Sequence, residues 1–183
     1  MDPRTDAILG AQGVGTDGVD KRIDVISTAM AGGLTAGDLA RLELAYAPQF
    51  GSAKDPVNML GYLAENLADD LVRTVQWHEL EDRMRNGAVL LDVRTAAEHL
   101  AAPIPGSIHL ALDELRDHLD VIPSGRPVVV HCGVGLRAHT AARLLAQHGY
   151  DVANLDGGHR TWLAGTRARA QSGPSPVVLR PAG

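Results

Sequence analysis

The sequence of 183 residues contains a single cysteine, few aromatic residues and no long apolar run. One cysteine excludes an internal disulfide framework, and it also excludes a zinc ribbon or redox pair built on a CxxC motif. Because aromatic residues make up only 3% of the chain, a core must consist of Ala, Val, Leu and Ile. Neither a membrane-spanning run of about 18 apolar residues nor a secretion signal is found. We therefore expect a soluble, cytoplasmic protein, and recovery of the native chain in a membrane pellet would contradict this.

The balance of charges is mildly acidic. A net charge of -5 and an isoelectric point near 5.9 provide no bulk attraction to nucleic acid or to an anionic membrane, so neither is predicted as a partner. The eight histidines are scattered along the chain without the spacing of paired metal ligands. The sequence therefore predicts no metal site and no cofactor.

The chain is organised in two regions of different character and a tail. Its length exceeds that of a typical domain of about 100 to 150 residues, which favours one complete domain with an appendage. We predict a partial N-terminal domain over residues 1–72, a compact domain over residues 73–165 and a tail over residues 166–183. Pro, Ser and Gly are so dense in the tail that we expect it to be mobile.

The first region is predicted to be a small α+β unit. Apolar residues at helical spacing, capping residues and a proline in a first helical turn mark its helices, and short apolar runs mark its strands. The predicted elements are, in order, a strand over residues 6–12, a helix over residues 19–30, a short helix after the capping box of Thr35 and Asp38, a strand over residues 42–47 and a helix that starts at Asp55 and Pro56.

The second region alternates strands and helices, the pattern of an α/β domain with a parallel sheet covered by helices. Continuous apolar runs such as AVLLDV and PVVVH are typical of strands that are buried on both faces. Thr95 and Glu98 form a capping box at a helix start. The predicted strands cover residues 74–76, 88–93, 107–110, 127–131 and 151–155, and the main helices cover residues 77–87 and 137–149.

The single cysteine, Cys132, follows the predicted buried strand PVVVH and precedes a helix by a few residues. Ligands bind at this carboxyl edge of parallel sheets. Glycines in the connecting loop allow several backbone N–H groups to point inward, and the helix start adds positive charge, so we expect a thiolate at the mouth of the loop. Arg137 adds a permanent charge. The residues predicted to form the substrate loop are Gly133, Val134, Gly135 and Leu136.

The neighbours of Cys132 disfavour two other interpretations of this residue. A lone cysteine is often a small buried core residue, but such a residue requires neither the glycines nor the arginine that follow here. Cysteine-dependent phosphatases also use an anion-binding loop, yet they place five residues between Cys and Arg, whereas four lie between Cys132 and Arg137. The shorter loop suits a single sulfur better than a phosphate. We therefore interpret Cys132 as an activated nucleophile.

The segment from Cys132 to Arg137 resembles the C-x-x-G-x-R active loop of the rhodanese family of sulfurtransferases. LLDVRTAAEHL, PIPGSIHL and LDGGHRTW resemble the family's D-x-R, I-P-G-A and D-G-G-x-x-x-W signatures in the same order, although Pro103 stands where the family often has His. The resemblance implies a rhodanese-like fold and transfer of sulfur from a donor such as thiosulfate, through a Cys132 persulfide, to cyanide or a thiol. It also implies that Arg137 orients the loop or the donor. Asp92 and Arg94 end the predicted strand LLDV and should lie at the same edge of the sheet, where we expect them to supply supporting hydrogen bonds; the alternative is a pair of ordinary charges at a strand end.

Glycines at residues 13, 15 and 18 satisfy the G-x-G-x-x-G pattern of dinucleotide-binding loops. Such a site also needs a second strand about 20 residues later that ends in an acidic residue. A helix is predicted there instead, followed by Gly32 and Gly33. We therefore predict no nucleotide site in this segment.

The first region also resembles a known family. ILGAQGVGTDGVDKRIDVISTAM and LELAYAPQFGSAKDPVNMLGY resemble the closing part of the dimerisation domain of pyridine-nucleotide disulfide oxidoreductases, especially coenzyme A disulfide reductases. The FAD and NAD domains of that family are not in the sequence, so we expect no flavin chemistry from this chain alone. The resemblance implies that Tyr46 faces a partner's active site; the alternative is a buried tyrosine in a strand.

An incomplete sheet in the first region is expected to leave an unpaired edge and an exposed apolar face. We therefore predict self-association, either as a homodimer or with a flavoprotein subunit. Two functions follow: a sulfurtransferase that acts through Cys132, and a non-catalytic or accessory module that docks onto a flavoprotein or delivers sulfur to it.

Overall fold

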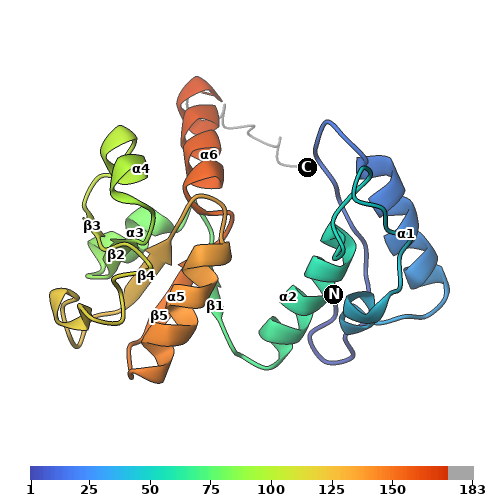
Figure 1. The fold of residues 1–183 in the computed structure, drawn as a ribbon, viewed down its shortest axis with the longest axis horizontal. Helices are drawn as coiled ribbons and strands as arrows, with labels where there is room; N and C mark the ends of the chain where they lie inside the picture. Colours follow the sequence, from blue (N-terminus) through green and yellow to red (C-terminus); the bar gives the residue numbers. More distant parts are fainter. Residues whose placement is uncertain (173–183) are drawn as a thin grey trace, which may run out of the picture. The chain divides into compact units, whose positions relative to one another are not determined.

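The structure is a computed structural model that describes residues 1–172. The chain divides between Leu71 and Val72 into two compact units (Figure 1). None of the helices within residues 1–172 has both the length and the apolar character needed to cross a membrane.

The second unit is built on a five-stranded parallel sheet with the strand order β1-β5-β4-β2-β3. This confirms the predicted α/β architecture. The strands are β1 (Arg73–Val75), β2 (Val89–Asp92), β3 (Ser107–His109), β4 (Val128–His131) and β5 (Val152–Leu155). All residues of β2 and β4 are buried, as expected for central strands whose two faces are both covered.

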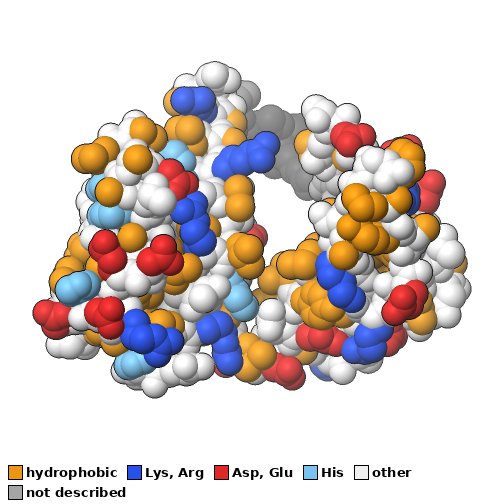
Figure 2. Space-filling view, in the orientation of Figure 1, with side chains coloured by type: hydrophobic (Ala, Val, Ile, Leu, Met, Phe, Trp, Pro, Cys, Tyr) orange, Lys and Arg blue, Asp and Glu red, His pale blue; other side chains and the backbone are white. Residues whose placement is uncertain are grey.

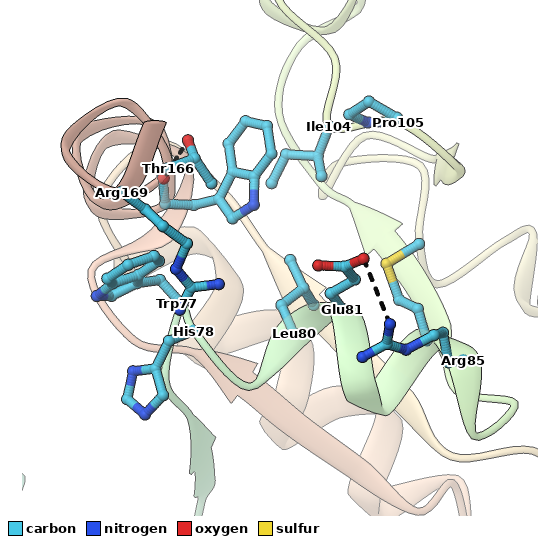
Figure 3. A pocket seen from close by; sticks show the side chains of 11 residues that line it. Trp77, His78, Leu80, Glu81, Arg85, Ile104, Pro105, Thr166 and Arg169 are labelled. Atoms are coloured by element: carbon cyan, nitrogen blue, oxygen red, sulfur yellow. Dashed lines mark hydrogen bonds and ion pairs between the residues drawn. The ribbon is translucent and has the colours of Figure 1, made fainter. Parts of the chain in front are cut away.

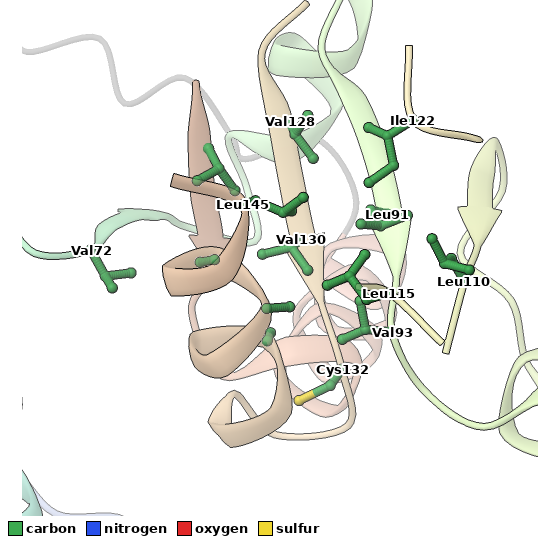
Figure 4. Packing of buried hydrophobic residues seen from close by; sticks show 14 residues of the cluster. Val72, Leu91, Val93, Leu110, Leu115, Ile122, Val128, Val130, Cys132 and Leu145 are labelled. Carbon is green, nitrogen blue, oxygen red and sulfur yellow. The ribbon is translucent and has the colours of Figure 1, made fainter. Parts of the chain in front are cut away.

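Helices cover both faces of this sheet. They are α3 (Leu80–Arg85), α4 (Ala96–Ala101), α5 (Leu136–Gln147) and α6 (Gly158–Ser172), with the short 3₁₀ helix η2 (Leu119–Val121). Alternate residues of a strand point to opposite faces. Val128 and Val130 of β4 therefore pack in a cluster with Leu145 of α5 (Figure 4), whereas Val129 packs in a second cluster with Leu80 of α3.

The C-terminal helix differs from the sequence prediction. We expected the tail to begin at residue 166, but α6 continues to Ser172. The residues from Thr166 to Ser172 include Arg and Ala, which are good helix formers, and Thr166 Oγ1 donates hydrogen bonds to the carbonyls of Trp162 and Leu163. The rest of the predicted tail, residues 173–183, lies outside the described residues.

The first unit contains α1 (Val19–Ala31), the 3₁₀ helix η1 (Gly37–Arg41) and α2 (Pro56–Ala68). The helices were predicted, and so were the reciprocal hydrogen bonds between Thr35 and Asp38. The two predicted strands are wrong. The segment 6–12 makes one isolated bridge, between Ala7 and Thr35, and the segment 42–47 has no strand pairing. A strand needs a neighbouring strand to bond its backbone groups along its length, and apart from this bridge neither segment has one within residues 1–71.

Side chains near the start of α2 hold the first unit together. Asp55 accepts a hydrogen bond from the amide of Val57 and pairs with Arg22 of α1 at 3.1 Å. Asn58 is buried and donates to the carbonyls of Leu39 and Leu42. Because a buried amide without partners is costly, these bonds fix α2 against η1.

Candidate active site

Cys132 lies at the carboxyl end of β4. This strand pairs with β5 on one side and with β2 on the other, so both of its edges are held. Helix α5 begins soon afterwards, at Leu136. The connecting loop, residues 132–135, therefore occupies the edge of the sheet where ligands bind in open α/β folds.

The sulfur of Cys132 accepts a hydrogen bond from the backbone amide of Gly135 at 3.1 Å. Gly135 has a φ of 123°, a backbone conformation that residues with a side chain rarely adopt. The amide and the start of α5 both stabilise negative charge at this position.

The sulfur is less open than the sequence predicted. We expected several amides around a sulfur at the mouth of the loop, but the hydrogen bond to the sulfur comes from Gly135, and Cys132 is only 1% exposed. Its side chain joins the apolar cluster between α5 and the sheet, where it lies at the end near the loop (Figure 4). Burial is favourable for a thiol, since Cys packs as a small apolar residue.

Two backbone hydrogen bonds hold the loop against the start of α6. The amide of His159 donates to the carbonyl of Cys132 at 2.8 Å, and the amide of Arg160 donates to the carbonyl of Gly133 at 3.0 Å. Gly158 permits this approach: it has a φ of 58°, and a Cβ there would lie 2.6 Å from the Cys132 oxygen. The sequence identified the D-G-G motif as part of a family signature, and its contact with the cysteine loop was not predicted.

Arg137, in the first turn of α5, forms a two-pronged ion pair with Glu98 of α4. Its Nη1 and Nη2 atoms each lie 2.7 Å from a carboxylate oxygen of Glu98. The hydrogen bond with Glu98 is the main reason why the pKa of Arg137 is raised, and Cys132 adds a smaller contribution. The sequence identified Glu98 only through its capping box with Thr95, which the structure confirms.

Asp92 and Arg94 lie at the end of β2, beside His131. Asp92 is fully buried and accepts hydrogen bonds from the backbone and guanidinium of Arg94, with His99 Nδ1 at 2.9 Å. Burial would raise the pKa of Asp92, but the hydrogen bonds from Arg94 and His99 and the neighbouring His131 lower it overall. Arg94 also donates to the carbonyl of Ala102. The pair thus joins β2 to the end of α4.

His131 directly precedes the cysteine and is fully buried. Burial lowers its pKa to about 4, so the ring is neutral at physiological pH. Its Nε2 has no hydrogen-bond partner and lies 3.7 Å from an oxygen of Asp92. The sequence marked this residue only as the end of a strand. Within residues 1–172, no group of three or more His, Cys, Asp or Glu side chains is arranged to hold a metal ion.

A cavity of about 500 Å³ lies beside α3 and α6 (Figure 3). Its lining includes Trp77, Trp162 and Arg169, and the guanidinium of Arg169 lies 4.8 Å from the centre of the Trp77 ring. Trp162 packs on the cluster of Val129 and Leu80, on the opposite face of the sheet from the cluster of Cys132. The cavity is therefore separate from the cysteine loop.

The first unit presents several apolar side chains to solvent (Figure 2). Tyr46 is 54% exposed and belongs to no strand, so the interpretation as a buried strand tyrosine is wrong. The exposed apolar residues predicted for this region are present. They are Leu9, Val14, Met30, Leu34, Tyr46, Phe50, Met59, Leu60, Tyr62, Leu63 and Leu67.

Comparison with known sequences relates the chain to coenzyme A disulfide reductases. The enzyme from Staphylococcus aureus (strain bovine RF122 / ET3-1) is 53% identical over 58 residues, and the enzyme from Staphylococcus haemolyticus (strain JCSC1435) is 53% identical over 60 residues. These matches cover 32% and 33% of this chain. The chain spans only 13% and 14% of the length of these curated relatives.

Two solved structures resemble a larger part of the chain. Reduced CoADR-RHD of Bacillus anthracis matches with 49% identity and a TM-score of 0.80, covering 84% of this chain and 28% of that protein. An NAD-dependent persulfide reductase from A. fulgidus matches with 40% identity and a TM-score of 0.73, covering 81% of this chain and 26% of that protein. Both matches are longer than residues 76–183, so they include part of the first unit.

The family model of the Rhodanese-like domain matches residues 76–165 of this chain. This range contains β2 to β5, the loop of Cys132 and about half of α6. The parallel sheet and the order of the sequence motifs agree with this match. Residues 76–165 therefore form a rhodanese-like domain.

Proposed function

We propose that the protein is a sulfurtransferase that carries sulfane sulfur as a persulfide on Cys132. The observation that carries this proposal is the hydrogen bond from the Gly135 amide to the cysteine sulfur, at a helix start within a rhodanese-like domain. The donor is a small sulfur compound such as thiosulfate, and the acceptor is a thiol or cyanide. We expect this cycle in the cytoplasm, where thiols are kept reduced.

The chemistry consists of two displacements. The Cys132 thiolate attacks the outer sulfur of thiosulfate, the S–S bond of the donor breaks, and sulfite leaves with the electron pair. The negative charge then resides on the terminal sulfur of the persulfide. Cyanide attacks this sulfur, thiocyanate leaves, and the thiolate is restored. Backbone amides and a helix start suit both anions, because they stabilise charge without a proton transfer.

Access to the sulfur is the structural condition for this cycle. Cys132 is 1% exposed, whereas Val134 in the same loop and Leu136 at the start of α5 are well exposed. A donor in solution therefore reaches the sulfur only when the loop shifts. Movement of these two side chains disturbs few core contacts, since both already face solvent.

If Cys132 carries the sulfur covalently, the reaction should show a specific kinetic pattern. With thiosulfate and cyanide varied independently, the double-reciprocal plots of thiocyanate formation should be parallel, because sulfite leaves before cyanide binds. Initial rates are measured by the colour of the iron–thiocyanate complex. Intersecting lines would mean that both substrates bind before any sulfur moves, and this would contradict a persulfide intermediate.

A second candidate function is an accessory module for a flavoprotein. It is favoured by the relatives, which are a coenzyme A disulfide reductase and a persulfide reductase of which this chain matches a minor part. In this proposal the first unit is a partial dimerisation domain, and its exposed apolar side chains associate with a second copy or with a flavoprotein subunit. Light scattering during size-exclusion chromatography should give the mass of a dimer; a stable monomer at micromolar concentration would contradict self-association.

A further inference from the structure

The carboxylate of Glu98 is fixed in place from its own helix. Its Oε2 atom accepts hydrogen bonds from the amide of Thr95 at 3.0 Å and from the hydroxyl of Thr95 at 2.9 Å. These bonds close the capping box at the start of α4. Hydrogen bonds from Arg137 and Thr95 lower the pKa of Glu98 to about 2, so the carboxylate is charged at physiological pH.

The ion pair between Glu98 and Arg137 lies beside the residue that follows the cysteine. A Cβ atom placed on Gly133 would lie 3.5 Å from Nη2 of Arg137 and 3.9 Å from Oε1 of Glu98. The side chains of Arg137 and Glu98 are 36% and 39% exposed, so a solute that approaches the loop meets both charges.

This arrangement changes what Arg137 offers to an anion. A free guanidinium binds an oxyanion with two parallel hydrogen bonds. Here both terminal nitrogens already donate to Glu98, and the carboxylate cancels the positive charge. The pair is neutral overall, so an anionic donor gains no net attraction from Arg137, and the attraction that is lost grows in proportion to the charge of the donor.

We propose that Glu98 is a specificity-determining residue, which selects against doubly charged sulfur donors by occupying the guanidinium of Arg137. This inference rests on the proposed sulfur transfer at Cys132, and it adds a residue that decides which donors are used. Donors with a single negative charge are expected to be used more efficiently, relative to thiosulfate, than they would be without the carboxylate.

The test compares two donors that differ by one charge. Thiosulfate is a dianion, and the methanethiosulfonate anion carries a methyl group in place of one oxygen and has a single charge. Each gives its outer sulfur to the Cys132 thiolate; sulfite leaves from the first donor and methanesulfinate from the second, each with the electron pair of the broken S–S bond. For the Glu98→Gln variant, kcat/KM for thiosulfate relative to methanethiosulfonate should rise roughly 3- to 10-fold, mainly through KM.

The matched control is Glu79→Gln. Glu79 accepts a hydrogen bond from the amide of Gln76 at the start of α3, as Glu98 does from the amide of Thr95 at the start of α4. The side-chain oxygen of a glutamine can accept the same hydrogen bond at either position. The control should leave the donor ratio unchanged. An unchanged ratio in Glu98→Gln would overturn the inference, because a residue with a purely structural role lowers activity with both donors alike.

The experiment distinguishes a failure of the proposed sulfur transfer from a failure of the role proposed for Glu98. If neither donor adds sulfur to the wild-type protein, the sulfur-transfer proposal itself is wrong. Binding of the two anions to Cys132→Ser, with and without Glu98→Gln, then tests the charge selection without any reaction. Calorimetry should show that removal of the carboxylate strengthens thiosulfate binding more than methanethiosulfonate binding, and equal effects would contradict the role of Glu98.

Discussion

Replacement of Cys132 by serine is expected to reduce thiocyanate formation from thiosulfate and cyanide to the uncatalysed background. A serine hydroxyl is not ionised at neutral pH and forms no persulfide, so both displacements lose their nucleophile. We expect a loss of at least about 10³-fold in kcat, the scale found when an enzyme loses its nucleophile. Rates of wild type and variant are compared under identical donor and acceptor concentrations.

The control for the Cys132→Ser variant is a measurement that shows whether it is still folded. Cys132 is buried in the cluster under α5, so a hydroxyl there is expected to cost about 1 to 3 kcal/mol of unfolding free energy. Circular dichroism and urea unfolding establish whether the second unit remains folded. Equal background rates for a folded variant and wild type would leave the accessory module as the function.

Asp92→Asn is expected to lower the unfolding free energy of the second unit by about 3 to 5 kcal/mol. The side chain of Asp92 is fully buried and that of Arg94 is 5% exposed, so removal of the carboxylate charge leaves a buried guanidinium without its counter-ion. The effect is measured by urea unfolding at neutral pH. Asp156→Asn, at an exposed aspartate after β5 that accepts a bond from Gln76, should change stability by less than about 0.5 kcal/mol.

The contribution of Asp92 to the free energy of unfolding also depends on pH. Folding lowers the pKa of this carboxyl. Its stabilising effect is therefore complete above the unfolded-state pKa of about 3.9 and is lost as the pH falls through the folded-state value. The difference in unfolding free energy between wild type and Asp92→Asn should shrink below about pH 4. A difference that stays constant down to acid unfolding would contradict the ionised, paired state of Asp92.

The helices and strands of the second unit were largely predictable because the sequence patterns that indicate them are local. Continuous apolar runs identified β2 and β4, and Thr95 with Glu98 identified the start of α4. The position of Cys132 follows from the strand and helix on its two sides. These patterns depend on neighbours within a few residues, which a single sequence displays directly.

Contacts between distant residues were not predictable in this way. The ion pair of Glu98 with Arg137 and the approach of Gly158 to Cys132 depend on how α4 and α6 pack near the loop. The burial of the sulfur has the same origin, since it results from the packing of α5 on the sheet. In the first unit, the apolar run over residues 42–47 looks like a strand, but a strand forms only with a partner.

The most direct test of the central claim is mass spectrometry of the protein after incubation with thiosulfate. The account predicts one added sulfur atom, located on the peptide that contains Cys132, and its complete removal by cyanide with release of thiocyanate. A peptide that remains unmodified while the protein is folded and the donor is in excess would contradict the account.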